Sequence, residues 1–198
     1  MSGAPLFLAS RSPRRAELLR QVGVAFEVVD VEVDESVVPG EAPRDYVLRL
    51  AQAKAMAAAA GVPATAAVLA ADTTVTIDGE IFGKPEDAAD ARRMLERLSG
   101  CWHEVLTAVA LAHAGTCRAC VVSTRVQFRA LDPGMIAAYW DSGEPADKAG
   151  GYGIQGLGGG LVRRIEGSYG AVVGLPLCET LELLEEAGVA HALRPAGP

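Results

Sequence analysis

The sequence predicts an α/β protein. Short apolar runs typical of buried strands alternate along the chain with stretches whose apolar residues recur at helical spacing. Prolines and glycines separate these stretches and mark their ends. Half of the 198 residues are apolar and 22% are charged, a composition typical of a soluble globular protein. Because no linker or internal repeat divides the chain, we expect a single domain over residues 1–198.

In the first half, the expected strands cover about residues 5–9, 26–31 and 68–71, and the expected helices about 14–22 and 43–60. Pro13 suits a first helical turn, and Gly61 ends the longer helix. Asp72 follows the third strand, and we expect it at that strand's C-terminal end, where α/β sheets place their chemistry. A hairpin turning at Asp78-Gly79 comes next.

In the second half, helices are expected at about 87–99, 133–143 and 176–187, and strands at about 102–113, 119–129 and 161–165. The two long strands form an antiparallel ribbon that turns at Gly115. Residues 144–160 contain many glycines and read as a long loop. Loops of this length are usually tied to function.

Charge and cysteine content exclude several classes of protein. The net charge of −7 argues against a general nucleic-acid binder, which needs a broad basic surface. Four scattered cysteines do not make a disulfide framework, and no apolar run approaches the roughly 18 residues that cross a bilayer. We therefore expect a cytoplasmic protein without a membrane partner. Cys117 and Cys120 have the spacing of a redox or zinc pair, but no second pair accompanies them.

The segment from Ser10 to Arg15 is a candidate anion site. It places two hydroxyls and three guanidinium groups between a predicted strand and a predicted helix. Ser12 is a potential N-cap, and the free N–H groups of a first helical turn attract negative charge. Arginine forks match phosphate oxygens two at a time. The alternative is a capped helix whose arginines are merely solvated.

Lys54 falls on the apolar stripe of the helix expected at 43–60. Together with Val47, Leu50, Ala51 and Ala58 it occupies one helical face. A lysine in that position needs an anion as a partner. The alternative is that its long side chain extends outward to water.

Basic and acidic residues from separate segments form a mixture that phosphoanhydride hydrolysis requires. The basic residues are Arg14, Arg15, Lys54, Lys84 and Lys148, and the acidic ones are Glu35, Asp72 and either Asp34 or Asp147. Cations offset the charge of a phosphate chain, and carboxylates hold Mg²⁺ or activate a water. The chain contains no P-loop or serine-hydrolase motif. Residues 151–156 match a dinucleotide fingerprint, but they lack its strand and helix context.

Several ordered motifs identify the chain as similar to the Maf family of nucleotide pyrophosphatases along nearly its whole length. They are LASRSPRRAELL (8–19), AQAKA (51–55), ADTTV (71–75), GKP (83–85), HEVLTAVA (103–110), DKAGGYGIQG (147–156) and GSYGAVVGLPL (167–177). The resemblance implies an elongated mixed α/β fold of two lobes, related to the inosine-triphosphate pyrophosphatases. It places the active site in the central cleft.

The resemblance also implies an activity and roles for particular residues. It implies a metal-dependent enzyme, using Mg²⁺ or Mn²⁺, that cleaves a nucleoside triphosphate to the monophosphate and pyrophosphate, with a homodimer as the expected assembly. Asp72 matches the proton acceptor, and Glu35 matches a carboxylate that helps Asp72 to hold metal. Other matches are Ser10, Arg15, Lys54 and Lys84 for the phosphate chain and activity, Lys148 by its motif, and Arg14, Thr73 and Gln155 for substrate choice in the dTTP/UTP branch.

Gln155 has a physical reason to favour a pyrimidine. Its carboxamide offers an acceptor and two donors, which suit the N3–H and adjacent carbonyl of uracil or thymine. It could instead brace the glycine-rich loop through the backbone. Two other functions stay open at this point: the 7-methyl-GTP branch of the same family, and regulation of cell division by protein binding.

Overall fold

The computed structural model describes residues 4–195 and has the predicted α/β architecture. In these residues the strands form a seven-stranded sheet in the order β2-β1-β3-β5-β6-β7, with β4 paired to β3. The last four strands along the chain are β4 (Glu80–Phe82), β5 (Trp102–His113), β6 (Thr116–Phe128) and β7 (Val162–Glu166). β1 (Leu6–Leu8) runs parallel to both β2 (Glu27–Val28) and β3 (Ala67–Ile77). The β3–β4 and β6–β7 pairs are antiparallel. The sheet is therefore mixed.

The chain divides into two compact units. Of the described residues, the first comprises 4–72, 107–122 and 174–195, and the second comprises 73–106 and 123–173. The boundary falls inside three strands, β3, β5 (Trp102–His113) and β6 (Thr116–Phe128). Both units are therefore built from discontinuous segments of sequence.

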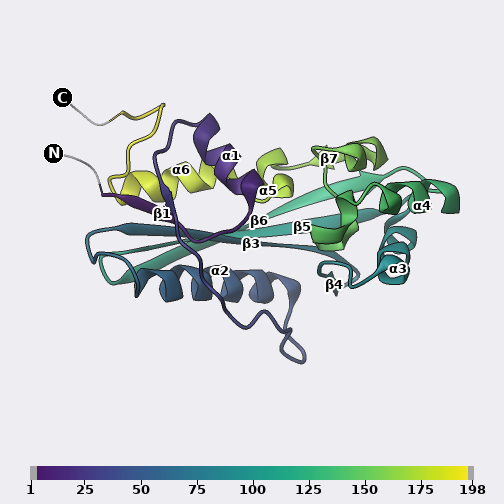
Figure 1. Ribbon diagram of the computed structural model, residues 1–198, viewed down its shortest axis with the longest axis horizontal. Coiled ribbons are helices and arrows are strands. Elements are labelled where there is room, and N and C mark those ends of the chain that lie inside the picture. The colour runs from purple at the N-terminus through teal and green to yellow at the C-terminus, as the bar shows by residue number, and fades with distance from the viewer. Residues whose placement is uncertain (1–3, 196–198) are drawn as a thin grey trace. The chain divides into compact units, whose positions relative to one another are not determined.

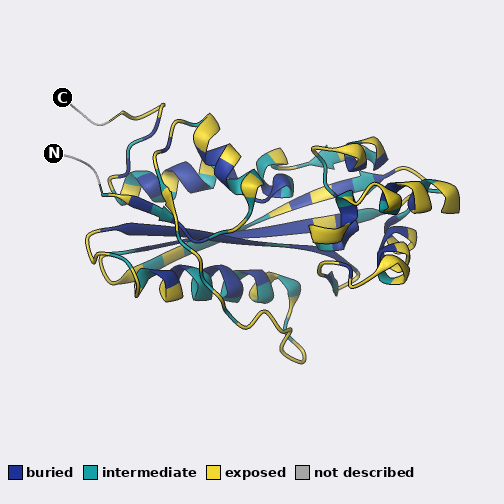
Figure 2. Cartoon of the chain, viewed as in Figure 1, coloured by how far each residue is buried: buried dark blue, intermediate teal, exposed yellow. Residues whose placement is uncertain are grey.

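In the first unit, helices cover both faces of the sheet. α2 (Pro43–Ala59) lies on one face, and α1 (Pro13–Gln21) and α6 (Leu177–Glu186) lie on the other (Figure 1). β3 and residues 107–112 of β5 are almost wholly buried between these layers, whereas residues 116–122 of β6 are intermediate or exposed (Figure 2). Apolar residues of α2 that the helical spacing placed on one stripe, such as Val47 and Leu50, are buried. The apolar stripe of α2 therefore faces the sheet, as expected for an amphipathic helix that covers a hydrophobic core.

The sequence predicts Asp72 at the C-terminal end of a strand, and this prediction is wrong: Asp72 lies inside β3. β3 continues through it to Ile77 and turns into β4 (Glu80–Phe82). The β-branched residues after Asp72 favour extended backbone, and they pair with β4 instead of ending the strand. The parallel partner β1, however, reaches only as far as Leu69 along β3. Asp72 therefore lies just beyond the end of the parallel pairing with β1.

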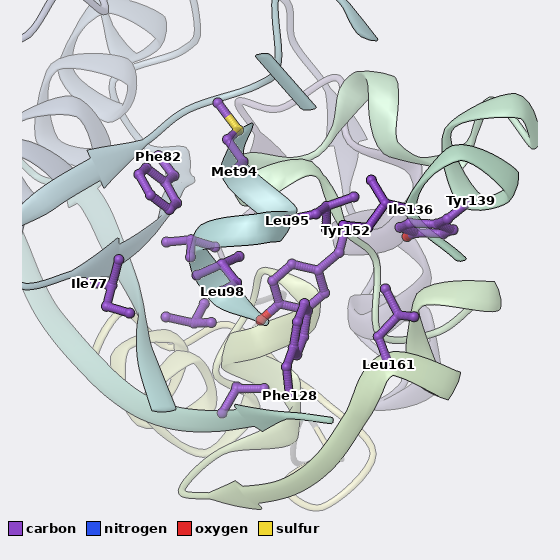
Figure 3. Packing of buried hydrophobic residues seen from close by; sticks show 13 residues of the cluster. Ile77, Phe82, Met94, Leu95, Leu98, Phe128, Ile136, Tyr139, Tyr152 and Leu161 are labelled. Atoms are coloured by element: carbon purple, nitrogen blue, oxygen red, sulfur yellow. The ribbon is translucent and has the colours of Figure 1, made fainter. Parts of the chain in front are cut away.

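The second unit has its own hydrophobic core. α3 (Ala88–Leu98) packs against α4 (Pro133–Asp141), and β7 (Val162–Glu166) pairs with β6. Asp87 and Asp132 cap the two helices by accepting a backbone N–H. Figure 3 shows side chains of this core, including Phe82, Leu98 and Phe128. The helices and strands expected here therefore form close to the predicted bounds.

Residues 144–161 are more regular than the predicted loop. They form three short 3₁₀ helices, η1 (Glu144–Asp147), η2 (Ala149–Gly151) and η3 (Leu157–Leu161). The short helix α5 (Tyr169–Val173) was not predicted, because the glycines in and around it read as loop residues. The missing context that excluded a dinucleotide site is confirmed, since 3₁₀ helices flank residues 151–156 where the motif needs a strand before and an α-helix after.

The structure also bears on the cysteine pair and on membrane-spanning segments considered in the sequence analysis. Cys117 and Cys120 both lie in β6, where residues three apart point to opposite faces of the sheet. The pair therefore cannot chelate one ion or form a disulfide. Among the helices in residues 4–195, none is both long enough and apolar enough to cross a membrane.

His103 should make the fold sensitive to acid. Burial lowers the pKa of His103 from 6.5 to about 4, and its Nε2 lies 2.8 Å from the Tyr152 hydroxyl. As pH falls below 6.5, His103 binds a proton in the unfolded chain but stays neutral in the folded protein. The free energy of unfolding therefore keeps its full value above pH 6.5 and decreases as pH falls toward 4. We expect a loss of about 3 kcal/mol from this group.

The measurement is urea unfolding between pH 7 and pH 4 for the native chain and His103→Gln. The variant lacks the titrating ring, so its free energy of unfolding should fall less steeply over this range. Parallel pH curves for the two proteins would contradict the prediction.

Candidate active site

The Ser10–Arg15 segment forms a helix N-terminus that holds one arginine in place. Ser12 caps α1 and accepts the backbone N–H of Arg15, with Pro13 in the first turn. The Arg15 Nη1 donates to Ser10 Oγ at 3.2 Å, and its Nε donates to the carbonyl of Gly174 at 2.8 Å. The Gly174 carbonyl had no signal in the sequence. These bonds fix the guanidinium rather than leaving it in solvent.

The three arginines of this segment have different surroundings. Arg11 pairs with Asp30 and Glu32 on the exposed surface, so the solvated alternative is correct for Arg11. Burial lowers the pKa of Arg15, while the charge of Asp72 raises it. Arg14 is half-buried, and its charge also acts on Arg15.

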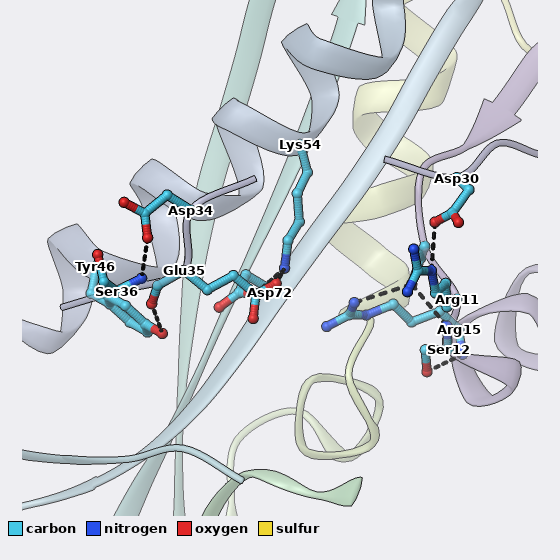
Figure 4. Close-up of polar contacts among 11 residues, drawn as sticks. Arg11, Ser12, Arg15, Asp30, Asp34, Glu35, Ser36, Tyr46, Lys54 and Asp72 are labelled. Atoms are coloured by element: carbon cyan, nitrogen blue, oxygen red, sulfur yellow. Dashed lines mark hydrogen bonds and ion pairs between the residues drawn. The ribbon is translucent and has the colours of Figure 1, made fainter. Parts of the chain in front are cut away.

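Lys54 joins two carboxylates. Its Nζ lies 2.7 Å from Asp72 Oδ1 and 2.7 Å from Glu35 Oε1 (Figure 4). The Lys54 and Asp72 side chains are 13% and 11% exposed, whereas that of Glu35 is 55% exposed. The prediction that this lysine meets an anion is confirmed, and the alternative that it extends to water is wrong.

Asp72 is a buried carboxylate with opposing influences on its charge. Burial raises the pKa of Asp72 above its ordinary value of 3.8, although the Lys54 ammonium and the Arg15 guanidinium lower it. The charge of Glu35 raises it further. A carboxylate in such a setting combines high basicity with nearby cations, which is the pattern found at catalytic sites.

Glu35 is positioned by contacts from α2. The Tyr46 hydroxyl donates to the Glu35 carbonyl at 3.0 Å, and Arg49 donates to the carbonyl of Ser36 and to both carboxylate oxygens of Glu41. Burial, with the charges of Asp72 and Glu35, raises the pKa of Tyr46 to about 12. Sequence reasoning missed Tyr46 because no motif links it to Glu35.

The two alternative acidic candidates have local partners. Asp34 accepts the N–H of Ser36 at 2.9 Å, a turn contact that, with the Ser36 hydroxyl, lowers the pKa of Asp34. Asp147 pairs with the neighbouring Lys148 at 2.6 Å. Both therefore contribute to local turn or loop structure.

The other predicted residues belong to the second unit. Lys148 Nζ donates to the Glu144 carbonyl at 2.7 Å as well as to Asp147. Lys84 is exposed, and the carbonyl of Gly83 before it accepts the Gly150 N–H at 2.9 Å. These contacts connect the Gly83–Pro85 segment with the glycine-rich segment that carries Lys148.

Thr73 and Gln155 differ in exposure. Thr73 is half-buried in β3, directly after Asp72, and has a polar or electrostatic partner. Gln155 is exposed, and its carboxamide forms no hydrogen bond with any residue in 4–195. The structure therefore does not support the alternative in which this carboxamide braces the loop.

Comparison with models of known protein families identifies the family of this chain. The family model described as Maf-like protein matches residues 5–187. The chain belongs to the Maf family. The match covers every candidate residue that the sequence motifs selected for this Maf protein.

Curated relatives of this Maf chain are similar over nearly its full length. A dTTP/UTP pyrophosphatase from Hahella chejuensis is 56% identical over 93% of this chain and 92% of its own. One from Vibrio cholerae is 54% identical over 94% of this chain and 100% of its own. A nucleoside-triphosphatase / dITP/XTP pyrophosphatase from Mycobacterium abscessus covers 63% of this chain and 74% of its own, with 22% identity and a TM-score of 0.41.

The first unit of this Maf protein therefore contains a compact charged centre. A buried carboxylate, a second carboxylate, an ammonium and a guanidinium lie within direct or electrostatic reach of one another. Such a group can bind an anionic phosphate chain through its cations and accept a proton on Asp72.

Proposed function

We propose that the protein hydrolyses dTTP and UTP to the nucleoside monophosphate and pyrophosphate. The observation that carries the proposal is the buried Asp72 carboxylate bound to Lys54 beside Glu35 and Arg15. Relatives at 51–56% identity that are named dTTP/UTP pyrophosphatases support the choice of reaction.

In this proposal Asp72 accepts a proton from the water that attacks the α-phosphorus. Its raised pKa makes it a stronger base than an exposed aspartate. Arg15 and Lys54 offset charge on the phosphate oxygens, with Ser10 holding the Arg15 guanidinium. We assign Lys84 and Lys148 to the same task, as the motifs imply. The bond broken joins the α-phosphorus to the oxygen that leaves with pyrophosphate.

We propose that a divalent metal binds at this site together with the substrate. In the described part of the chain, no group of three or more His, Cys, Asp or Glu side chains is arranged to hold a metal. Asp72 and Glu35 nevertheless supply two carboxylates, and Mg²⁺ is commonly held by one or two carboxylates together with substrate phosphates. We propose these two residues as ligands for Mg²⁺ or Mn²⁺. When bound, the metal would polarise the phosphate and neutralise its charge.

We assign the choice of base to Gln155, with Arg14 and Thr73. The exposed Gln155 carboxamide has its acceptor and donors available for the N3–H and adjacent carbonyl of uracil or thymine. Cytosine presents the opposite order of donor and acceptor to the same edge. A fixed carboxamide orientation therefore favours uracil over cytosine.

The test is a substrate panel of UTP, dTTP, CTP and 7-methyl-GTP with Mg²⁺, in which pyrophosphate and orthophosphate are measured separately. We expect pyrophosphate from UTP and dTTP, at least 10-fold lower kcat/KM for the other two, and no turnover with excess chelator. Orthophosphate as the only product would overturn the cleavage position. Preference for 7-methyl-GTP would place the protein in the other branch of the family.

The remaining parts of the proposal concern the cell. We propose a cytoplasmic enzyme, which agrees with four free cysteines, and a homodimer, on the family resemblance alone. Nucleic acid is not a proposed partner because the net charge is −7. If a catalytically inactive variant kept a full effect on cell division, regulation by protein binding would replace catalysis as the main role.

A further inference from the structure

The Glu144 carboxylate binds the backbone of the glycine-rich segment just after Gln155. Its Oε2 accepts the Leu157 N–H at 2.7 Å, and its Oε1 accepts the Gly158 N–H at 3.0 Å. The Tyr139 hydroxyl donates to the same Oε1 at 2.8 Å. One side chain therefore receives three hydrogen bonds at the start of η3.

Tyr139 extends this connection to the residues before Gln155. Its hydroxyl oxygen accepts the Gly153 N–H at 3.0 Å while its proton goes to Glu144. The Tyr139 ring is anchored in the core of the second unit, near Ile136 (Figure 3). Glu144 and Tyr139 together thus hold the backbone on both sides of Gln155. We call this pair the Glu144–Tyr139 clamp.

Gly156 and Gly158 leave room for the close approach of the clamp. A side chain at Gly156 would overlap the Glu144 carboxylate, and one at Gly158 would overlap the Tyr139 hydroxyl and the Gly153 carbonyl. Glycine is the residue that permits such close contact. Because glycine backbone is also the most flexible, contacts outside the segment must fix its conformation.

The charge of Glu144 suits this task. Partial burial alone would raise the pKa of Glu144, but the Gly158 N–H, the Tyr139 hydroxyl and the Leu157 N–H together hold it below its usual range. An ionised carboxylate only accepts hydrogen bonds, and all three of its partners are donors. An amide at the same position would turn one NH₂ group toward a donor.

We propose that Glu144 is a positioning residue for base selection: through the Glu144–Tyr139 clamp it fixes the segment around Gln155, so that the Gln155 carboxamide meets the base in one orientation. Gln155 has no hydrogen bond of its own within residues 4–195, so its placement depends on the backbone that carries it. The inference rests on the proposed function in that it takes a uracil or thymine nucleotide as the ligand.

Two variants weaken the clamp in different ways. Glu144→Gln replaces one acceptor oxygen, and Tyr139→Phe removes the bonds to Gly153 and to Glu144 while keeping the aromatic ring in the core. Asp141→Asn is the matched control, since this exposed carboxylate at the end of α4 lies only three residues before Glu144. Circular dichroism and thermal unfolding establish that each variant is folded.

The first measurement is kcat/KM for UTP divided by kcat/KM for CTP. We expect this ratio to fall about 10-fold in either clamp variant, mainly through a higher KM for UTP, and to stay unchanged in Asp141→Asn. The double variant Glu144→Gln/Gln155→Ala should have the same ratio of UTP to CTP kcat/KM as Gln155→Ala alone, because Glu144 affects base selection only through Gln155. An unchanged ratio in both clamp variants, or additive losses in the double variant, would overturn the inference.

The second measurement separates this inference from the proposed function. Titration calorimetry with UTP and CTP in excess chelator reports base preference without turnover. If the native protein prefers UTP and the clamp variants lose that preference, the inference stands even if no pyrophosphate is ever released. If the native protein binds UTP and CTP equally, or if the clamp variants keep the native preference, the inference fails whatever the activity.

Discussion

Replacing Asp72 by asparagine is expected to lower kcat for UTP by three to four orders of magnitude, the upper part of the range for loss of a general base. The amide has nearly the same shape but does not accept a proton from water. The fold should be retained, because the substitution removes a charge whose burial is unfavourable and Lys54 keeps Glu35 as its ionic partner. Steady-state kinetics at saturating UTP and Mg²⁺ measure the effect, and urea unfolding checks the fold.

Asp45→Asn is the matched control for this variant. Asp45 is also an aspartate of the first unit, but it is exposed in the first turn of α2. Its replacement should leave kcat within about twofold of the native value, since exposed groups away from a site have small effects. Turnover of folded Asp72→Asn within 10-fold of native would remove Asp72 from its assigned role.

Local patterns in the sequence predicted much of the fold. Pro13 and Ser12 indicated the start of α1, because helix capping depends on residues within one turn. The position of Lys54 on an apolar stripe correctly indicated an anionic partner. These successes share one property: the information lies in neighbouring residues.

Contacts between distant segments could not be predicted in this way. Asp72 was placed at a strand end because the apolar run stops there, whereas β3 continues by pairing with β4. The Gly174 carbonyl contacts Arg15 from 159 residues away, and backbone carbonyls have no sequence signature. Glu144 was likewise overlooked as a site residue, since its role depends on the bend that returns residues 157–158 to it.

Replacing Lys54 by methionine should reduce both stability and activity. Methionine keeps an unbranched apolar stem but removes the ammonium, leaving the Asp72 carboxylate buried close to the Glu35 carboxylate. Breaking a buried ion pair on one side costs about 3 kcal/mol, and loss of a cation aimed at the phosphates lowers kcat/KM by about 10²- to 10³-fold. Urea unfolding at pH 7 and steady-state kinetics with UTP measure the two effects.

The double variant Lys54→Met/Asp72→Asn distinguishes the structural contribution of the pair from its chemistry. With both charges removed, the free energy of unfolding should return to within about 1 kcal/mol of the native value, because no unpaired buried charge is left. Activity should stay as low as in Asp72→Asn, and Lys54→Arg, which keeps the positive charge, should be more stable than Lys54→Met. If Lys54→Met were as stable and active as the native protein, the ammonium would have neither role. Recovery of stability in the double variant would show that the pair balances charge in the fold, whereas the part of Lys54 in the reaction is measured by Lys54→Met, in which Asp72 is kept.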